Sequence, residues 1–260
     1  MKILTLNTWQ ENGPWRERWK IIFSGLEQMK PDIAGFQEVF NTAWAAEIQK
    51  RTGYRTLVFP KEPGGLLILS RFPVTRTECL TLKTKSPSEE YFRYVLFAEL
   101  QTEKKPLAVF NTHWSWQLLE SSVRQKQAEE FLNFVSQKAG NGECVAMGDF
   151  NSTAWTPEIR KLKEAGFADT FAGLHPEKPG LTWDNANPDA FGSNHPMPDR
   201  RIDYIFFTPS PLSSPPSRGR GKGEGGILER PESAEVVFMK PDEQGRFASD
   251  HYGVFVTFKI

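Results

Sequence analysis

Short apolar runs rich in β-forming residues recur along the chain and are separated by polar stretches. Runs of this length, bounded by turn residues, are typical of strands that are buried on one or both faces. They predict strands at residues 2–7, 32–37, 65–70, 94–100, 106–113, 143–149, 201–207, 234–239 and 252–260.

Helical patterns are fewer and are recognised by the wider spacing of their apolar residues. The clearest covers residues 118–139, where the apolar side chains share approximately one face and Gly140 marks the end. Further helices are predicted at residues 14–29, at residues 43–51, and after Thr156, where Pro157 suits a first helical position.

The predicted strands outnumber the predicted helices by roughly two to one. A regular alternation of strand and helix around one parallel sheet therefore fits poorly, and we predict an α/β (α+β) sandwich built on more than one sheet. The 260 residues, 38% of them hydrophobic, suffice for one large core, and no linker divides the first 207. We predict a single domain over residues 1–260.

One segment differs in composition from the rest of the chain. Residues 208–234 are rich in Pro, Ser and Gly and nearly free of apolar side chains. Such a segment cannot bury enough surface to offset the entropy of ordering it, so we expect a flexible insertion between two strands. Its basic residues could contact an anionic partner, but a solvated tract is the simpler interpretation.

Charge and composition narrow the classes of function. Thirty-two basic and thirty-two acidic residues give a formal net charge of zero, unlike a protein that holds duplex DNA mainly through its phosphates. The two cysteines are too few for a disulfide framework and indicate reduced core thiols. No apolar run reaches the ~18 residues of a membrane span, and no secretory leader pattern precedes the first strand. We therefore predict no membrane span and a cytoplasmic location.

Residues able to bind a metal or transfer a proton stand at the ends of many predicted strands. If the last strand runs antiparallel to its neighbours, its first residues reach the edge where theirs end. In an extended backbone, Asp149 and Asn151 would also point the same way. One edge of the sandwich would then collect carboxylates, amides and imidazoles, from Asn7, Glu38, His113, Asp149, Asn151, Asp203, Asp250 and His251.

Each of these residues also has a purely structural explanation. Asn7 suits a turn, and Glu38 suits a solvated strand end. The segment "GDFNS" fits an Asx turn or a helix cap, and "SDH" can simply open a strand. His113 is also typical of a hydrogen-bonded, half-buried histidine. Asp203 is harder to explain, because a carboxylate within a buried strand requires a partner.

Seven segments, in their order along the chain, resemble a known family. They are "TLNTW", "FQEV", "LSRFP", "NTHW", "GDFN", "RIDYIF" and "SDHYGV", and they span residues 4–254. The sequence resembles the endonuclease/exonuclease/phosphatase superfamily, which includes deoxyribonuclease I, exonuclease III, neutral sphingomyelinases and inositol polyphosphate 5-phosphatases. The most specific part is "GDFN" followed about 100 residues later by "SDH".

This resemblance implies a four-layered α/β/β/α sandwich, with two mainly antiparallel sheets face to face and helices outside. It also implies phosphoester hydrolysis assisted by Mg²⁺ or Mn²⁺. Glu38 would be the main metal ligand, with Asn7 close by, since Mg²⁺ prefers hard oxygen donors. Asp250 would contribute to the metal site or orient its neighbour.

The same resemblance implies catalytic roles. Asp149 would hold and deprotonate the attacking water, and Asn151 would position that water or a phosphate oxygen. His113 and His251 would donate to the phosphate as charge develops in the transition state. Asp203 would orient one of the two histidines, and the sequence leaves open which one.

Departures from the family pattern bear on the substrate. Abasic-site endonucleases of the family have a tyrosine segment where this chain has "NTHW", so His113 favours the deoxyribonuclease I, sphingomyelinase and phosphatase branches. Tryptophans near the motifs could line a substrate pocket, although core packing explains a tryptophan equally well. The candidates are Trp9, Trp114, Trp116, Trp155 and Trp183.

We therefore predict a Mg-dependent phosphoric ester hydrolase that acts as a monomer on a small molecule, a sugar phosphate or a lipid headgroup. The alternative is a nuclease of the same fold that acts on DNA or RNA. A basic strip leading away from Asp149 would favour nucleic acid, and a closed aromatic pocket would favour a small substrate. A binding protein that lost the chemistry is disfavoured, because every expected catalytic side chain is present.

Overall fold

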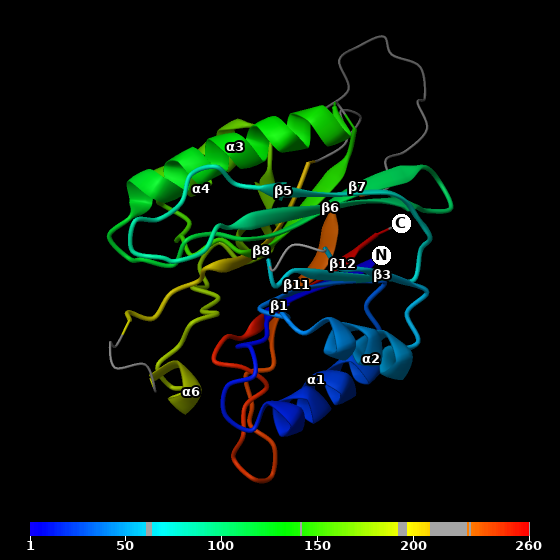
Figure 1. Ribbon diagram of the computed structural model, residues 1–260, viewed down its shortest axis with the longest axis vertical. Coiled ribbons are helices and arrows are strands. Elements are labelled where there is room, and N and C mark those ends of the chain that lie inside the picture. Colours follow the sequence, from blue (N-terminus) through cyan, green and yellow to red (C-terminus); the bar gives the residue numbers. More distant parts are fainter. Residues whose placement is uncertain (61–63, 141, 192–196, 209–227, 229, 260) are drawn as a thin grey trace.

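Two six-stranded sheets lie face to face at the centre of the molecule (Figure 1). The computed structural model describes residues 1–60, 64–140, 142–191, 197–208, 228 and 230–259. The first sheet has the order β11 (Pro231–Val237), β12 (Gly253–Phe258), β1 (Lys2–Asn7), β2 (Ile33–Gln37), β4 (Leu67–Ser70), β3 (Thr56–Val58). The second has the order β5 (Val74–Thr81), β6 (Tyr94–Gln101), β7 (Pro106–His113), β8 (Cys144–Asp149), β10 (Asp203–Phe207), β9 (Ala168–Asp169).

Helices cover the outer faces of both sheets (Figure 1). The first sheet carries α1 (Trp15–Met29) and α2 (Thr42–Thr52), and the second carries α3 (Ser121–Ala139) and α4 (Pro157–Glu164). Two short helices follow in the chain, α5 (Thr170–Leu174) and α6 (Pro188–Phe191). Within the described part of the chain, every helix is too short or too polar to serve as a transmembrane span.

Three apolar clusters separate the layers. Because strand residues alternate sides, Ile3 faces the core between the sheets, whereas its neighbour Leu4 packs with Trp19 of α1. On the opposite side, Phe110 of β7 packs against Phe131 of α3. The four-layered α/β/β/α sandwich with two mainly antiparallel sheets is confirmed.

Each sheet contains one parallel pair of strands, β1 with β2 and β7 with β8. Helices α1 and α3 form the connections, so both pairs end at one edge of their sheets. Strand β12 is antiparallel to β1, the arrangement considered from the sequence, and therefore begins where β1 ends. Strands β6 and β10 are likewise antiparallel to β7 and β8 and begin at the same edge.

Local sequence sets the ends of the helices. The Asn41 side chain accepts a hydrogen bond from the Trp44 amide, 3.0 Å away, and begins α2. Gly53, with φ of 66°, ends that helix in the left-handed conformation that suits glycine. Pro157 occupies the first turn of α4, as predicted.

Strands without an apolar run were not predicted. The edge strand β5 exposes most of its residues, and β3 and β9 are only three and two residues long. The predicted insertion over residues 208–234 is wrong at its end, because residues 231–234 form the start of β11. Residues 209–227 and 229 lie outside the described residues.

Candidate active site

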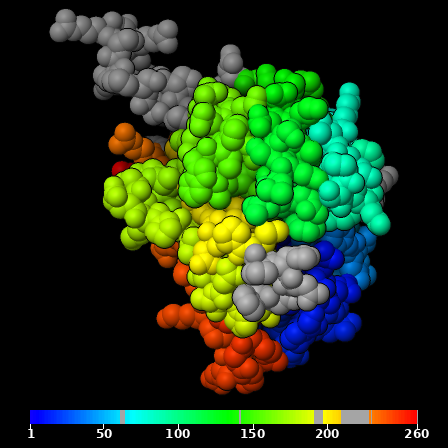
Figure 2. All heavy atoms as spheres, turned by 90° about the vertical axis from the view of Figure 1, so that its left-hand side faces the viewer, coloured from blue at the N-terminus to red at the C-terminus, as the bar shows by residue number. Residues whose placement is uncertain are grey.

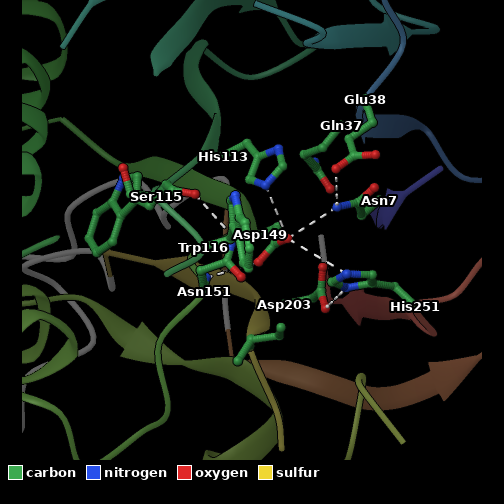
Figure 3. Close-up of polar contacts among 12 residues, drawn as sticks. Asn7, Gln37, Glu38, His113, Ser115, Trp116, Asp149, Asn151, Asp203 and His251 are labelled. Carbon is green, nitrogen blue, oxygen red and sulfur yellow. Dashed lines mark hydrogen bonds and ion pairs between the residues drawn. The ribbon is translucent and has the colours of Figure 1, made fainter. Parts of the chain in front are cut away.

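Polar side chains from both sheets meet at the edge where the parallel strands end (Figure 3). In the second sheet, His113 at the end of β7 lies beside Asp149 at the end of β8, and Asp203 at the start of β10 lies on the other side of Asp149. In the first sheet, Asn7 at the end of β1 lies beside Gln37 at the end of β2. The order of the strands thus brings these residues together.

The Asp149 carboxylate is the centre of this arrangement (Figure 3). Its side chain is 1% exposed, and its Oδ2 accepts a hydrogen bond of 3.1 Å from Asn7 Nδ2 across the two sheets. The same oxygen lies 3.4 Å from His113 Nε2 and 3.9 Å from His251 Nε2. One carboxylate oxygen is therefore shared by an amide and two imidazoles.

Asp203 pairs with His251 and not with His113. Its Oδ2 lies 2.9 Å from His251 Nδ1, and both side chains are buried. Burial alone would lower the pKa of His251, but the negative charges of Asp203, Asp149 and Asp250 outweigh it and raise the pKa to about 10. His251 is therefore a cation at neutral pH, with its Nε2 proton directed toward the site.

His113, unlike His251, is uncharged. Burial, together with the nearby Arg93 guanidinium, lowers the pKa of His113 to about 3. The imidazole is neutral at neutral pH and contributes one N–H donor and one acceptor. The two histidines beside Asp149 therefore differ in charge.

Asn151 lies beside Asp149, but not through the extended backbone that the sequence suggested. Strand β8 ends at Asp149, and Asn151 has φ of 48°, a left-handed conformation. The Asn151 amide N–H donates to Asp149 Oδ1 over 2.9 Å, which is the Asx turn considered from the sequence. Its side-chain Nδ2 donates to the Trp114 carbonyl oxygen over 3.0 Å.

Carboxylate and amide oxygens that could hold a metal ion lie on the first-sheet side of the site. Burial raises the pKa of Asp250 to about 7 and also raises the pKa of Glu38, and each is raised further by a neighbouring carboxylate. Glu38 Oε1 also accepts a 3.4 Å hydrogen bond from Asn7 Nδ2. Two crowded carboxylates beside an amide oxygen fit a Mg²⁺ or Mn²⁺ ion, which would relieve their repulsion.

A second group of possible ligands is formed by Asp149, Asp203 and His251, whose ligand atoms lie within 4.8 Å of one another. Within this group, His251 Nδ1 is already hydrogen-bonded to Asp203 Oδ2 at 2.9 Å, whereas Glu38 and Asp250 offer carboxylate oxygens, the donor type that Mg²⁺ prefers. Asp203 Oδ1 is nevertheless buried without a hydrogen-bond partner among the described residues, which leaves one acceptor in the site for a bound group.

A buried amide pair joins the two sheets beneath the site. Gln37 Nε2 donates to Asn111 Oδ1 over 2.7 Å, and Asn111 Nδ2 donates to the carbonyl oxygens of Phe36 and Leu67. These bonds fix the end of β2 against β7. Glu38 follows directly and has φ of 64°, a strained conformation that only a well-held neighbourhood maintains.

A pocket of about 220 Å³ opens over these residues. Of the predicted tryptophans, Trp116 and Trp183 line it, and the Trp183 ring meets the His251 ring edge to face at 5.0 Å. The prediction for Trp114 is wrong, because that ring is fully buried among Phe131 and Phe150.

The remaining two predicted tryptophans lie outside the pocket lining. Trp155 is 76% exposed on the surface. Trp9 is half-buried, with the Arg18 guanidinium 4.7 Å from the centre of its ring.

Five described residues of the lining were not predicted: Gln10, Tyr91, Arg93, Met197 and Arg200. Arg93 stands just before β6 and Arg200 just before β10, at the edge where these antiparallel strands begin. Arg93 Nη2 and Arg200 Nε are buried and have no hydrogen-bond partner among the described residues. The argument that an antiparallel strand begins at this edge, applied to the last strand in the sequence analysis, would also have predicted these two arginines.

Segments far apart in the chain meet on this side of the molecule. In the space-filling view, residues near position 200 (yellow) lie between two other parts of the chain (Figure 2). One is the green segment that includes α3, and the other is the dark blue N-terminal segment.

The carboxylates, amides and imidazoles at one edge of this two-sheet sandwich are the groups that a metal-dependent phosphoric ester hydrolase uses. The profile of the Endonuclease/Exonuclease/phosphatase family matches residues 4–251, and the chain belongs to that family. Its cofactor is Mg²⁺ or Mn²⁺.

Curated relatives include tyrosyl-DNA phosphodiesterase 2 from Gallus gallus and from Bos taurus. The Gallus gallus protein is 24% identical over 271 residues, which cover 98% of this chain and 67% of the relative. The Bos taurus protein is 23% identical over 252 residues, which cover 94% of this chain and 63% of the relative. The chain thus spans about two thirds of the length of these relatives.

Solved structures share the fold. D. rerio TDP2 complexed with single strand DNA product superposes with a TM-score of 0.77 at 21% identity, covering 100% of this chain and 99% of that chain. Beta toxin from Staphylococcus aureus superposes with a TM-score of 0.75 at 19% identity and covers 100% of both chains.

Proposed function

We propose that this protein is a DNA phosphodiesterase that hydrolyses a phosphodiester at the end of a single strand. This replaces the small-molecule substrate expected from the sequence with the nucleic-acid alternative. The observation that carries the choice is the similarity over 98% of the chain to a tyrosyl-DNA phosphodiesterase. A structure of D. rerio TDP2 with single-strand DNA product has the same fold over the whole of this chain.

The geometry of Asp149 supports the hydrolytic step. Its shared oxygen can accept the proton of a water held between Asn7 and His113, so that Asp149 acts as general base. The Asn151 amide N–H fixes the carboxylate through the Asx turn. The attacking oxygen would then approach the phosphorus from the Asp149 side of the pocket.

The two histidines have separate roles in this proposal. His251 is cationic and held by Asp203, so it donates to a phosphate oxygen as negative charge develops there. His113 is neutral and supplies an N–H donor without a full charge. Asn151 also lines the pocket and would contribute its amide there.

Glu38, Asp250 and Asn7 would hold the metal ion. When bound there, Mg²⁺ supplies charge neutralisation and polarises a phosphate oxygen. The protein would present the oxygen atoms of Glu38, Asp250 and Asn7 next to Asp149, and His251 would not be among the metal ligands.

The walls of the pocket are suited to a nucleotide chain. Trp116, 39% exposed, and Tyr91, 51% exposed, offer aromatic faces on which a base can stack. Arg93 and Arg200 keep a donor nitrogen without a partner among the described residues, which suits phosphates next to the scissile bond.

The experiment is a substrate panel for the purified protein with Mg²⁺ or Mn²⁺. The panel contains single-stranded oligonucleotides with a 5′-phosphotyrosyl or 3′-aryl phosphodiester end, their duplex forms, sugar phosphates, inositol phosphates and sphingomyelin. We expect the single-stranded ends to be hydrolysed fastest, with Asp149→Asn protein as the control for contaminating activity. Faster hydrolysis of a small phosphoester than of any oligonucleotide would refute the proposal.

A further inference from the structure

Arg18 of α1 is a fully buried arginine whose hydrogen bonds all reach backbone carbonyl oxygens. It donates to the carbonyls of Thr8, Trp9, Gln10 and Asn12 and, from a distant part of the chain, Ala248. The distances lie between 2.8 and 3.3 Å. The side chain is 0% exposed, and the Trp9 ring lies over the guanidinium at 4.7 Å.

The loop held by Arg18 leaves β1 directly after Asn7 and is strained. Trp9 has φ of 56° and Gln10 has φ of 49°, conformations that residues other than glycine adopt only when their surroundings impose them. Gln10 lines the pocket. The Trp9 amide also donates to Asn7 Oδ1 over 3.1 Å, so the shape of this loop fixes the orientation of the Asn7 side chain.

The second segment held by Arg18 leads to Asp250 and His251. Arg18 Nη1 bonds both the Thr8 carbonyl, at 2.8 Å, and the Ala248 carbonyl, at 3.1 Å. The next residue, Ser249, donates from Oγ to the Asn7 carbonyl over 2.7 Å and lies 3.1 Å from Asp250 Oδ1. Two segments far apart in the sequence, each carrying a proposed metal ligand, therefore meet at one guanidinium.

Only a guanidinium can make this set of bonds. Its five donors form a rigid fork, whereas a lysine offers three donors on one nitrogen. Burial lowers the pKa of the Arg18 guanidinium, and the nearby carboxylates of Asp250, Asp189 and Glu38 oppose this by favouring its charged form. Because its partners are neutral carbonyls, Arg18 supplies this charge without occupying the carboxylate oxygens that a metal requires.

We infer that Arg18 is a positioning residue for the metal site. It sets the affinity for the divalent cation by holding Asn7 and Asp250 in fixed positions relative to one another. The inference rests on the metal ligands proposed above, but not on the choice of DNA as substrate. Arg18 itself contacts neither the metal nor the substrate.

The test is direct Mn²⁺ binding, measured from the electron paramagnetic resonance signal of the free ion, by wild-type protein and Arg18→Lys. The matched control is Arg124→Lys, because Arg124 is also buried and holds the carbonyls of Ser115, Gln117 and Leu118 in the loop before α3. We expect Arg18→Lys to bind Mn²⁺ at least tenfold more weakly and Arg124→Lys to bind it as the wild type does. The Mg²⁺ concentration for half-maximal hydrolysis should rise in the same proportion in Arg18→Lys alone.

A folded Arg18→Lys protein with wild-type Mn²⁺ affinity would overturn the inference, and so would equal losses in the two variants. If Arg18→Lys does not fold, Trp9→Ala serves instead, since it uncovers the guanidinium but removes only a half-buried ring. Weaker Mn²⁺ binding by Trp9→Ala supports the role of Arg18, and unchanged binding contradicts it. Mn²⁺ binding without hydrolysis of any oligonucleotide would refute the proposed substrate while leaving this inference intact, whereas a wild type that binds no Mn²⁺ refutes both.

Discussion

The two oxygens of the Asp149 carboxylate have different partners. Its Oδ1 closes the Asx turn with the Asn151 amide, and its Oδ2 meets Asn7 and His113. The structural interpretation of "GDFNS" as an Asx turn is therefore confirmed, and the proposed general base would use the other oxygen of the same carboxylate.

Asp149→Asn is the sharpest test of the proposed general base. The amide keeps the size of the side chain and can still accept the Asn151 hydrogen bond, but it cannot accept a proton from water. We expect kcat for the best substrate to fall by about 10³-fold, while the melting temperature changes by only a few degrees. A variant that retains more than a tenth of the wild-type kcat would show that another group activates the water.

Asp203→Asn should change the pH dependence more than the fold. Removal of this negative charge lowers the pKa of His251 from about 10, and the cationic form is present only below that pKa. The alkaline limb of kcat/KM should therefore move to lower pH by about one unit or more, with the largest loss of activity above neutral pH. The measurement is the pH profile of kcat/KM for both proteins. An alkaline limb at the same pH in both would exclude a cationic role for His251.

At the scale of elements, the apolar runs were enough to predict the central strands and the four longest helices. Polar edge strands could not be predicted in this way. The residues of β5, for example, are mostly exposed and do not alternate between buried and exposed positions. The burial of Trp114 depends on the partners Phe131 and Phe150, which come from distant segments. Neighbouring residues in the sequence contain no information about such partners.

The close contact of β7 and β8 gives a prediction at the same scale. Gly148 has φ of 139°, and a Cβ there would lie 2.0 Å from the Thr112 carbonyl oxygen, a backbone atom that cannot move aside. A Cβ on Gly35 would instead lie 2.5 Å from the end of the flexible Met147 side chain. We expect Gly148→Ala to lose about 3 kcal/mol or more of unfolding free energy and Gly35→Ala about 1–2 kcal/mol. Urea denaturation of both variants checks this, and equal losses would contradict it.

Considered over the whole molecule, most of the site could be predicted because the strand ends of two sheets meet at one edge. Arg93 and Arg200, which precede β6 and β10, were not predicted. The argument that an antiparallel strand begins at this edge was applied only to the last strand. The sequence could not predict that Asp203 pairs with His251 and not with His113. This pairing depends on how β10 and the segment before β12 approach one another. The sequence also suggested a small substrate from the absence of a basic stretch, whereas the two basic pocket residues are far apart in the chain.

Metal binding should stabilise the whole molecule, and by more at high pH. Asp250, with its pKa raised to about 7, must be deprotonated to bind the ion, so the affinity should be about tenfold lower at pH 6 than at pH 8. A Mn²⁺ concentration 100 times the dissociation constant at pH 8 then stabilises the fold by about 2.7 kcal/mol at pH 8 and about 1.4 kcal/mol at pH 6. For a chain of this length, these values correspond to increases in melting temperature of about 5 °C and 2.5 °C.

Differential scanning calorimetry with Mn²⁺ and with a chelator at both pH values measures these increases. The Asp250→Asn variant is the control, because it lacks the titrating carboxylate while keeping an oxygen donor of the same size. Its Mn²⁺-induced increase should be smaller at pH 8 and nearly the same at both pH values. If the wild type shows equal increases at pH 6 and pH 8, Asp250 is not a ligand, and the metal is held by carboxylates that are already ionised at pH 6.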